Sequence, residues 1–262
     1  MQRNGARIAI GLILDQQEGM MSGSLLASRR GFLGSVAALG SGAVAAMPTA
    51  WASPVPQKAT GKSAKKEEED VSPNEDLMRE HGVLVRCLVI YRETMRRIDA
   101  RQDFPPAVIS GTATLIRTFV EDYHEKLEED QLFPRFRKAG KLVDLVDVLY
   151  TQHQKGRVVT DRVLQAVAPA ALKNADGRQN LRRYLDMFVR MYEPHEARED
   201  TVLFPEFKKI VSPHEYDALG EEFEKKENQL FGGDGFEKNV ARVAELEKQL
   251  GIYDLTMFTP QV

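Results

Sequence analysis

Residues 124–136 read HEKLEEDQLFPRF, and residues 195–207 read HEAREDTVLFPEF. The two stretches lie 71 positions apart and agree at seven positions: the first His and Glu, the second Glu, and the Leu, Phe, Pro and Phe that follow. Amphipathic helices repeat their apolar positions, but amphipathicity alone does not repeat a histidine and two glutamates in register. The match therefore indicates an internal duplication.

Two further histidines extend this repeat. His81 and His153 lie 72 positions apart, and each precedes one of the two stretches. Each half of the repeat thus supplies one isolated histidine and one His-x-x-x-Glu step. We expect two helical hairpins related by a pseudo-two-fold axis.

The chain around the repeat has apolar residues at three-and-four spacing, which is the period of an α-helix. A capping box at Ser72–Glu75 opens the first helix, a break is expected at Asp176–Gly177, and Pro194 is expected to bend the last helix. The four helices are predicted over about residues 72–97, 104–138, 142–167 and 180–210. No stretch alternates with period two, so we expect an all-α fold: an antiparallel four-helix bundle over residues 72–211.

Residues 212–262 are predicted to add two further helices that pack on the bundle, over about residues 212–230 and 237–250. The first of them opens with a second capping box at Ser212–Glu215. His214 falls inside this box and outside the repeat, so we expect it on the surface.

The N-terminal residues have the layout of an export signal. Within residues 22–52, an arginine pair is followed by an apolar, Gly/Ala-rich run and a closing Ala-Trp-Ala. Residues 28–33, SRRGFL, resemble the twin-arginine motif, which implies export to the periplasm in a folded state. An ordinary secretory signal or an uncleaved anchor is the alternative, although the run falls short of about 20 residues, so we expect no stable membrane anchor. Residues 1–20 are interpreted as a start-site extension, and residues 53–71 as a disordered linker.

Composition excludes several classes of function. The 262 residues include 36 basic and 39 acidic side chains, so no basic surplus favours a nucleic acid as partner. The single cysteine, Cys87, excludes an intramolecular disulfide and any cysteine-rich zinc or iron–sulfur site. A metal site in this chain therefore has to use histidines and carboxylates.

The two His-x-x-x-Glu steps have the spacing of such a site. Helical residues four apart differ by only about 40° in direction, so His124 points the same way as Glu128, and His195 the same way as Glu199. Apolar neighbours on these faces place them in the bundle interior, where unpaired carboxylates would be costly unless a cation compensates them. Imidazole with carboxylate suits iron, and also manganese or zinc.

The order of these residues resembles the hemerythrin family, also called HHE cation-binding domains, over about residues 73–210. The resemblance implies a non-haem di-iron centre bridged by two carboxylates, with manganese or zinc as weaker alternatives. The implied ligands are His81 with His124 for one iron, His153 with His195 for the other, and Glu128 and Glu199 as bridges.

The chain departs from the oxygen-carrying members of that family. Four residues after the third-helix histidine, where the carriers have a second histidine, stands Arg157, and the last carboxylate is Glu199 rather than an aspartate one position later. Glu125 matches a branch with more carboxylates, in which it is an additional ligand of the second iron. Its alternative reading is a solvent-facing charge near the bundle end. More carboxylate favours ferric iron and weakens the case for reversible oxygen carriage.

Three other features have open interpretations. Arg157 is expected to pair with Glu125 or a bound anion, or to extend to water. Tyr150 and Tyr192, each three residues before a predicted ligand, are expected to pack in the core or to hydrogen-bond to the site. The Leu-Phe-Pro-x-Phe segments are expected to provide core packing and a helix bend.

Several functions are compatible with this sequence. We expect a protein that binds a metal and oxygen, or a related diatomic or peroxide ligand, for oxygen binding, sensing or iron sequestration. A di-iron enzyme acting on peroxide or nitric oxide is one alternative. A metal-free interaction bundle and a single zinc or manganese site are others. The sequence identifies no protein partner.

Overall fold

The structure is a computed structural model that describes residues 71–262. The predicted start-site extension, export signal and nearly all of the predicted linker therefore lie outside the described residues. The described chain is built of helices without a strand, which confirms the all-α prediction. No helix among these residues has the length and apolar character needed to cross a membrane.

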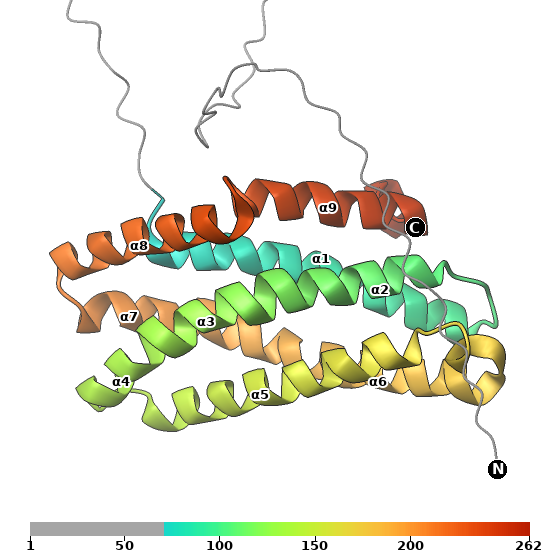
Figure 1. Ribbon diagram of the computed structural model, residues 1–262, viewed down its shortest axis with the longest axis horizontal. Helices are drawn as coiled ribbons and strands as arrows, with labels where there is room; N and C mark the ends of the chain where they lie inside the picture. The colour runs from blue at the N-terminus through green and yellow to red at the C-terminus, as the bar shows by residue number, and fades with distance from the viewer. Residues whose placement is uncertain (1–70) are drawn as a thin grey trace, which may run out of the picture. The chain divides into compact units, whose positions relative to one another are not determined.

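Four helical rods form the bundle, with short connections between successive rods (Figure 1). The first rod is α1 (Pro73–Asp99) and the third is α5 (Val143–Ala166). The second rod runs without interruption through α2 (Pro106–Leu115), η1 (Ile116–His124), α3 (Glu125–Leu127), η2 (Glu128–Leu132) and α4 (Phe133–Ala139). After a short turn, η3 (Ala171–Lys173), the fourth rod comprises α6 (Ala175–Arg198), η4 (Glu199–Leu203) and α7 (Phe204–Ile210).

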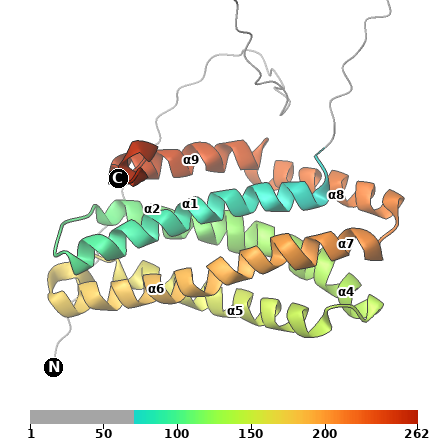
Figure 2. The same cartoon turned by 180° about the vertical axis from the view of Figure 1, so that it is seen from behind.

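The last two long helices, α8 (Pro213–Phe231) and α9 (Gly235–Leu250), cover one side of the bundle (Figure 2). α8 packs against α1, and α9 packs against both α1 and α2. An ion pair from Arg86 to Glu247 joins α1 to α9, with Nε and Oε1 3.0 Å apart. A final turn, η5 (Leu255–Phe258), follows α9.

Both predicted boxes form their serine N-cap. The Ser72 hydroxyl accepts a hydrogen bond from the Glu75 amide at the start of α1, and the Ser212 hydroxyl accepts one from the Glu215 amide at the start of α8. His214 is exposed within the second box, as predicted.

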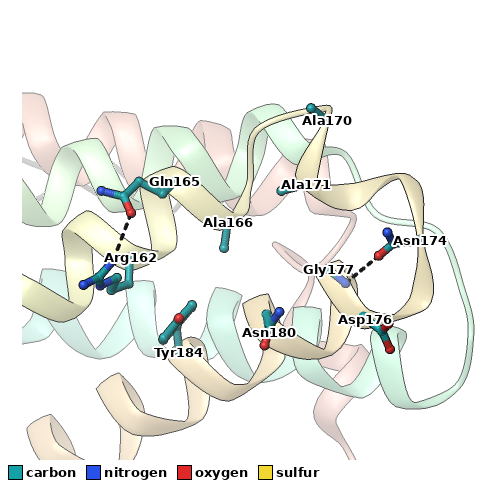
Figure 3. Close-up of a pocket in the computed structure, with 10 residues that line it drawn as sticks. All are labelled: Arg162, Gln165, Ala166, Ala170, Ala171, Asn174, Asp176, Gly177, Asn180 and Tyr184. Atoms are coloured by element: carbon teal, nitrogen blue, oxygen red, sulfur yellow. Dashed lines mark hydrogen bonds between the residues drawn. The ribbon is translucent and has the colours of Figure 1, made fainter.

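The predicted start of the fourth helix at residue 180 is wrong. The helix begins at Ala175, because the Asn174 side chain caps it by accepting the Gly177 amide at 2.8 Å (Figure 3). A Cβ at Gly177 would lie 1.6 Å from the Ala171 carbonyl oxygen, so glycine is required here by close approach of the preceding turn. The hollow beside this junction, about 400 Å³, is lined by none of the predicted metal ligands.

Two wide helical turns occupy equivalent places in the repeat, η2 in the second rod and η4 in the fourth. In each, an amide reaches a carbonyl five residues back: Phe133 to Glu128, and Phe204 to Glu199. The next residue in both rods is proline, which has no N–H and collides with the carbonyl four residues back in an α-helix. The π-type turn accommodates that ring and keeps both the glutamate and the phenylalanine in the interior.

The phenylalanines of the Leu-Phe-Pro-x-Phe segments pack around the histidines. Phe133 stacks on His153 at 5.4 Å between ring centroids, and Phe204 stacks on His81 at 5.5 Å, each pair with a 24° angle between ring planes. This matching geometry supports the pseudo-two-fold relation of the two hairpins. The predicted core role is confirmed for the leucine and the two phenylalanines of each segment, which are fully buried, whereas the prolines are exposed.

The two glycines inside α1 and α5 provide a test of core packing. A Cβ at Gly156 would lie 2.0 Å from the Tyr192 hydroxyl, whereas a Cβ at Gly82 meets nothing within 4 Å. We expect Gly156→Ala to lower the free energy of unfolding by about 1–3 kcal/mol through overpacking. Gly82→Ala should raise it by up to about 1 kcal/mol through helix propensity. Chemical denaturation of both variants measures the difference, and equal stability of the two would contradict the packing.

Candidate metal centre

Four histidines, one from each rod, meet in the bundle interior. Each is at most 4% exposed. They form two pairs, His81 with His124 and His153 with His195, whose ring centroids are 4.7 and 5.0 Å apart and whose planes cross at 52° and 51°. The structure therefore brings together all four histidines of the repeat, in the pairs that the family resemblance implies and with the symmetry that the repeat predicts.

Each imidazole is oriented by a hydrogen bond at its Nδ1 atom. The four acceptors and their distances are Asp200 for His81 (2.7 Å), Glu80 for His124 (2.8 Å), Glu129 for His153 (3.2 Å) and Gln152 for His195 (2.8 Å). Carboxylate and amide oxygens accept hydrogen bonds, so in each neutral ring the proton is assigned to Nδ1. The Nε2 lone pairs are left directed at the centre, which is the arrangement of metal-binding histidines.

Two fully buried carboxylates lie between the histidine pairs. The Oε1 atom of Glu199 is 3.1 Å from His195 Nε2, and its Oε2 atom is 3.4 Å from His81 Nε2. The Oε2 atom of Glu128 is 3.4 Å from His153 Nε2 and 3.8 Å from His124 Nε2. Each carboxylate therefore lies close to one imidazole of the first pair and one imidazole of the second.

The donor atoms of this cluster fit a cation. The Nε2 atoms of His153 and His195 are 3.2 Å apart. Among the described residues, the cluster's own histidines are the nearest nitrogen partners of the buried Glu128 and Glu199 oxygens, at 3.1–3.8 Å. Two ligands of one metal with bonds of about 2.1 Å lie roughly 3.0–3.4 Å apart, as these nitrogens do. Two sets of donor atoms each lie within 4.8 Å of one another: Glu128, His153, His195 and Glu199 in one, and His81, His124 and Glu128 in the other.

The pKa values of the two central carboxylates are shifted in opposite directions. Burial together with the neighbouring charge of Glu199 raises the pKa of Glu128 well above its usual range. Against its own burial, the imidazole of His195 holds the pKa of Glu199 low. Burial of the two carboxylates close together therefore favours the protonated form of Glu128, whereas Glu199 favours its ionised form.

A second polar group adjoins the cluster at Glu125, which is 1% exposed. Its reading as a solvent-facing charge is therefore wrong. The Tyr192 hydroxyl donates to Oε1 at 2.6 Å, and Arg157 pairs with Oε2 at 2.7 Å and with Glu129 at 2.8 Å. The predicted pairing of Arg157 with Glu125 is confirmed. The same glutamate also lies within 4.8 Å of a His153 nitrogen.

The two tyrosines predicted near the site differ in their positions. Tyr192 is buried and hydrogen-bonds to Glu125, so it combines both predicted roles. Tyr150 is 41% exposed, and the Arg137 guanidinium lies over its ring at 5.7 Å. Both predictions for Tyr150 are wrong, because α5 turns this position outward.

The sequence analysis does not predict the four side chains that accept the Nδ1 hydrogen bonds, although they stand at matching positions of the repeat. Glu80 and Gln152 directly precede the isolated histidines, 72 positions apart. Glu129 and Asp200 directly follow the central glutamates, 71 positions apart. Each of these positions therefore has a polar residue in both halves of the repeat, and this agreement could have identified them.

A family model described as the hemerythrin HHE cation-binding domain matches residues 72–176 and again residues 144–250. The chain belongs to this family. The second match begins 72 residues after the first, which equals the spacing between the isolated histidines of the internal repeat.

Curated relatives include uncharacterized proteins from Mycobacterium bovis and from two strains of Mycobacterium tuberculosis. Each is 46% identical over 225 residues, which cover 86% of this chain and 88% of the relative. No solved structure matches the chain.

The buried carboxyl of Glu121, one helical turn before Glu125, allows a pH test. Burial raises its pKa to about 7, although Thr160 donates to it at 2.5 Å and Arg117 lies 3.1 Å away. The unfolded chain loses this proton near pH 4.5, but the folded chain keeps it until about pH 7. Ionisation therefore lowers stability progressively across that interval and by a constant amount above it.

We expect Glu121→Gln, which cannot ionise, to be more stable than the parent protein by about 1–3 kcal/mol above pH 7. The difference should shrink toward zero as the pH falls to 4.5. Urea denaturation of both proteins at several pH values measures it, and a difference that does not change with pH would contradict the assignment.

Proposed function

We propose that the protein binds two metal cations in the interior of its helical bundle. His81 and His124 would hold one cation, His153 and His195 the other, and the carboxylates of Glu128 and Glu199 would bridge them. The observation that carries this proposal is that each central carboxylate reaches one imidazole of either pair. The complete burial of both carboxylates supports it further.

We propose iron as the metal. The donors are imidazole nitrogens and carboxylate oxygens, a set that suits iron in preference to softer metals, and membership of the family supports a cation. When bound, a pair of iron ions would supply the capacity to bind oxygen or peroxide and to exchange electrons with it. Manganese and zinc are the alternatives to be tested against iron.

Glu125 has a different role from the bridging glutamates in this proposal. Both of its oxygens are engaged, one by the Tyr192 hydroxyl and the other by Arg157. We therefore place it beside the cation of the second pair as a fixed charge and proton acceptor, and it becomes a ligand only if Arg157 withdraws.

The cellular role that we propose is an exported binding protein for oxygen or a related small ligand, or a store of iron. The twin-arginine motif supports export to the periplasm, and the buried site supports a small ligand. An enzyme acting on peroxide or nitric oxide is the second candidate. The specific observation that favours it is the Tyr192–Glu125 hydrogen bond beside His195, since reduction of either substrate consumes protons.

Metal content of purified variants tests the proposed site. We expect about two metal ions per chain in the parent protein and loss of most metal in His124→Ala and in Glu199→Ala, because each removes a buried ligand. His214→Ala is the matched control, since this histidine is exposed and remote from the repeat, and it should keep the parent content. Elemental analysis gives both the metal and its quantity.

Circular dichroism of the same variants shows whether metal loss is distinct from unfolding. Full retention of metal by the two ligand variants would contradict the assigned site. Fewer than one metal per chain in the parent protein, with no uptake of added iron, would favour a metal-free interaction bundle.

Reaction of the reduced, iron-loaded protein separates the two candidate roles. A reversible absorption band on mixing with oxygen is expected for a binding protein. Continuous gas evolution from peroxide, or consumption of nitric oxide over many turnovers, would instead establish the enzyme. Stopped-flow absorption and an oxygen electrode measure these outcomes.

A further inference from the structure

One face of α1 is left uncovered by the rest of the described chain. In Figure 2, α1 lies between α9 and α6 on the near side of the bundle. The exposed and half-buried positions of this face form a stripe in which spacings of three and four residues alternate. The stripe consists of Glu75, Met78, Gly82, Val85, Val89 and Arg92. It is therefore apolar along its centre, with an acidic residue at one end and a basic residue at the other.

The long side chains that flank the stripe are engaged elsewhere. Arg86 pairs with a glutamate of α9, and the Arg79 guanidinium lies over the Phe236 ring, 4.3 Å from its centroid. Neither arginine therefore extends its aliphatic stem across the stripe, as long charged side chains often do on apolar surfaces. Met78 and Val85 remain 43% and 44% exposed.

The glycine in the middle of the stripe has no packing role within the described chain. A Cβ at Gly82 meets nothing within 4 Å, whereas Gly156 is required by the close approach of Tyr192. A glycine inside a helix costs about 0.5–1 kcal/mol relative to alanine, but it lets another backbone approach closely. Gly82 therefore suits a helix that packs on α1 from outside the chain.

The equivalent stripe in the other half of the repeat is polar. Positions 72 residues further along the chain, on α5, are Asp147, Tyr150, Gln154, Arg157, Asp161 and Leu164. The three charged members all form ion pairs within the chain. The α5 stripe is thus an ordinary solvated surface, and the duplicated fold does not by itself require an apolar stripe on α1.

The α1 stripe is complementary to itself when two copies of the helix run antiparallel. With a two-fold axis between positions 83 and 84, Met78 of one copy faces Val89 of the other, and Gly82 faces Val85. Glu75 then faces Arg92 at both ends, so opposite charges close the apolar contact. A symmetric dimer requires this kind of self-complementary face. We propose that the α1 stripe binds a second copy of the chain.

The proposed dimer is weak and reversible. One helix of each copy forms its centre, whereas stable interfaces bury at least about 1,200 Å² in total. Arg92 already pairs with Glu193 of its own chain, so Glu75 of the other copy joins an existing ion pair. The charged ends therefore fix the antiparallel register more than they raise the affinity.

Sedimentation velocity of the purified protein at a series of concentrations tests the proposal. We expect a reversible monomer–dimer equilibrium in the parent protein. Val85→Asp should weaken dimerisation by at least about 10-fold, because the dimer would bury an unpaired carboxylate in each copy. Val158→Asp is the matched control: this valine of α5 is 52% exposed and lies outside the stripe, so the variant should dimerise like the parent protein.

Reversal of the charged ends tests the antiparallel register. Glu75→Arg sets arginine against arginine at both ends, and Arg92→Glu sets glutamate against glutamate, so each variant alone should dimerise about 10-fold more weakly. An equimolar mixture of the two variants should recover dimerisation, because each end of the mixed dimer then joins an arginine to a glutamate. Circular dichroism of every variant verifies that the bundle is folded.

Three results would overturn the proposal. The first is a parent protein that stays monomeric up to millimolar concentration. The second is equal dimerisation of Val85→Asp and Val158→Asp, which would place the contact on another face. The third is a mixture of the two charge variants that dimerises no better than either alone. If Val85→Asp instead lowers the stability of a monomeric parent protein to urea, the stripe is covered by a segment of its own chain and not by a second copy.

Discussion

The structure depends on the burial of two carboxylates between four imidazoles. Glu128 and Glu199 are completely buried, and their oxygens lie 3.1–3.8 Å from the Nε2 atoms of the four histidines. Such groups are costly in a protein interior unless a positive charge compensates them. The rest of the bundle can be understood as the framework that collects these carboxylates and the lone pairs of four histidines in one place.

The framework uses the same devices in both hairpins. A proline after each His-x-x-x-Glu step favours a wider turn, which holds the glutamate and the following phenylalanine on the interior side. The phenylalanine then stacks on a histidine of another rod, and a polar side chain next to each ligand holds its orientation. Packing and hydrogen bonding therefore fix the positions of the donors before any cation binds.

On this symmetric frame the surrounding charges are unequal. Arg157 neutralises the acidic groups beside His153, and its counterpart in the other half is an exposed valine. Duplication accounts for the shared geometry of the two pairs, while later divergence accounts for their different electrostatics.

The sequence by itself determined the repeat, the helical class and the buried face of each His-x-x-x-Glu step, because these depend on periodicity, identity and local spacing. It left the partner of Arg157 open among Glu125, a bound anion and water, and the fold decided for Glu125. It could not place the start of α6, since that depends on how closely the turn at Ala171 approaches Gly177. Only the tertiary structure decided that Tyr192 points inward and Tyr150 outward, although both stand three residues before a histidine. It alone also decided which histidine each of Glu80, Glu129, Gln152 and Asp200 orients. These contacts join different rods, and their partners are selected by how the rods pack, which no local pattern encodes.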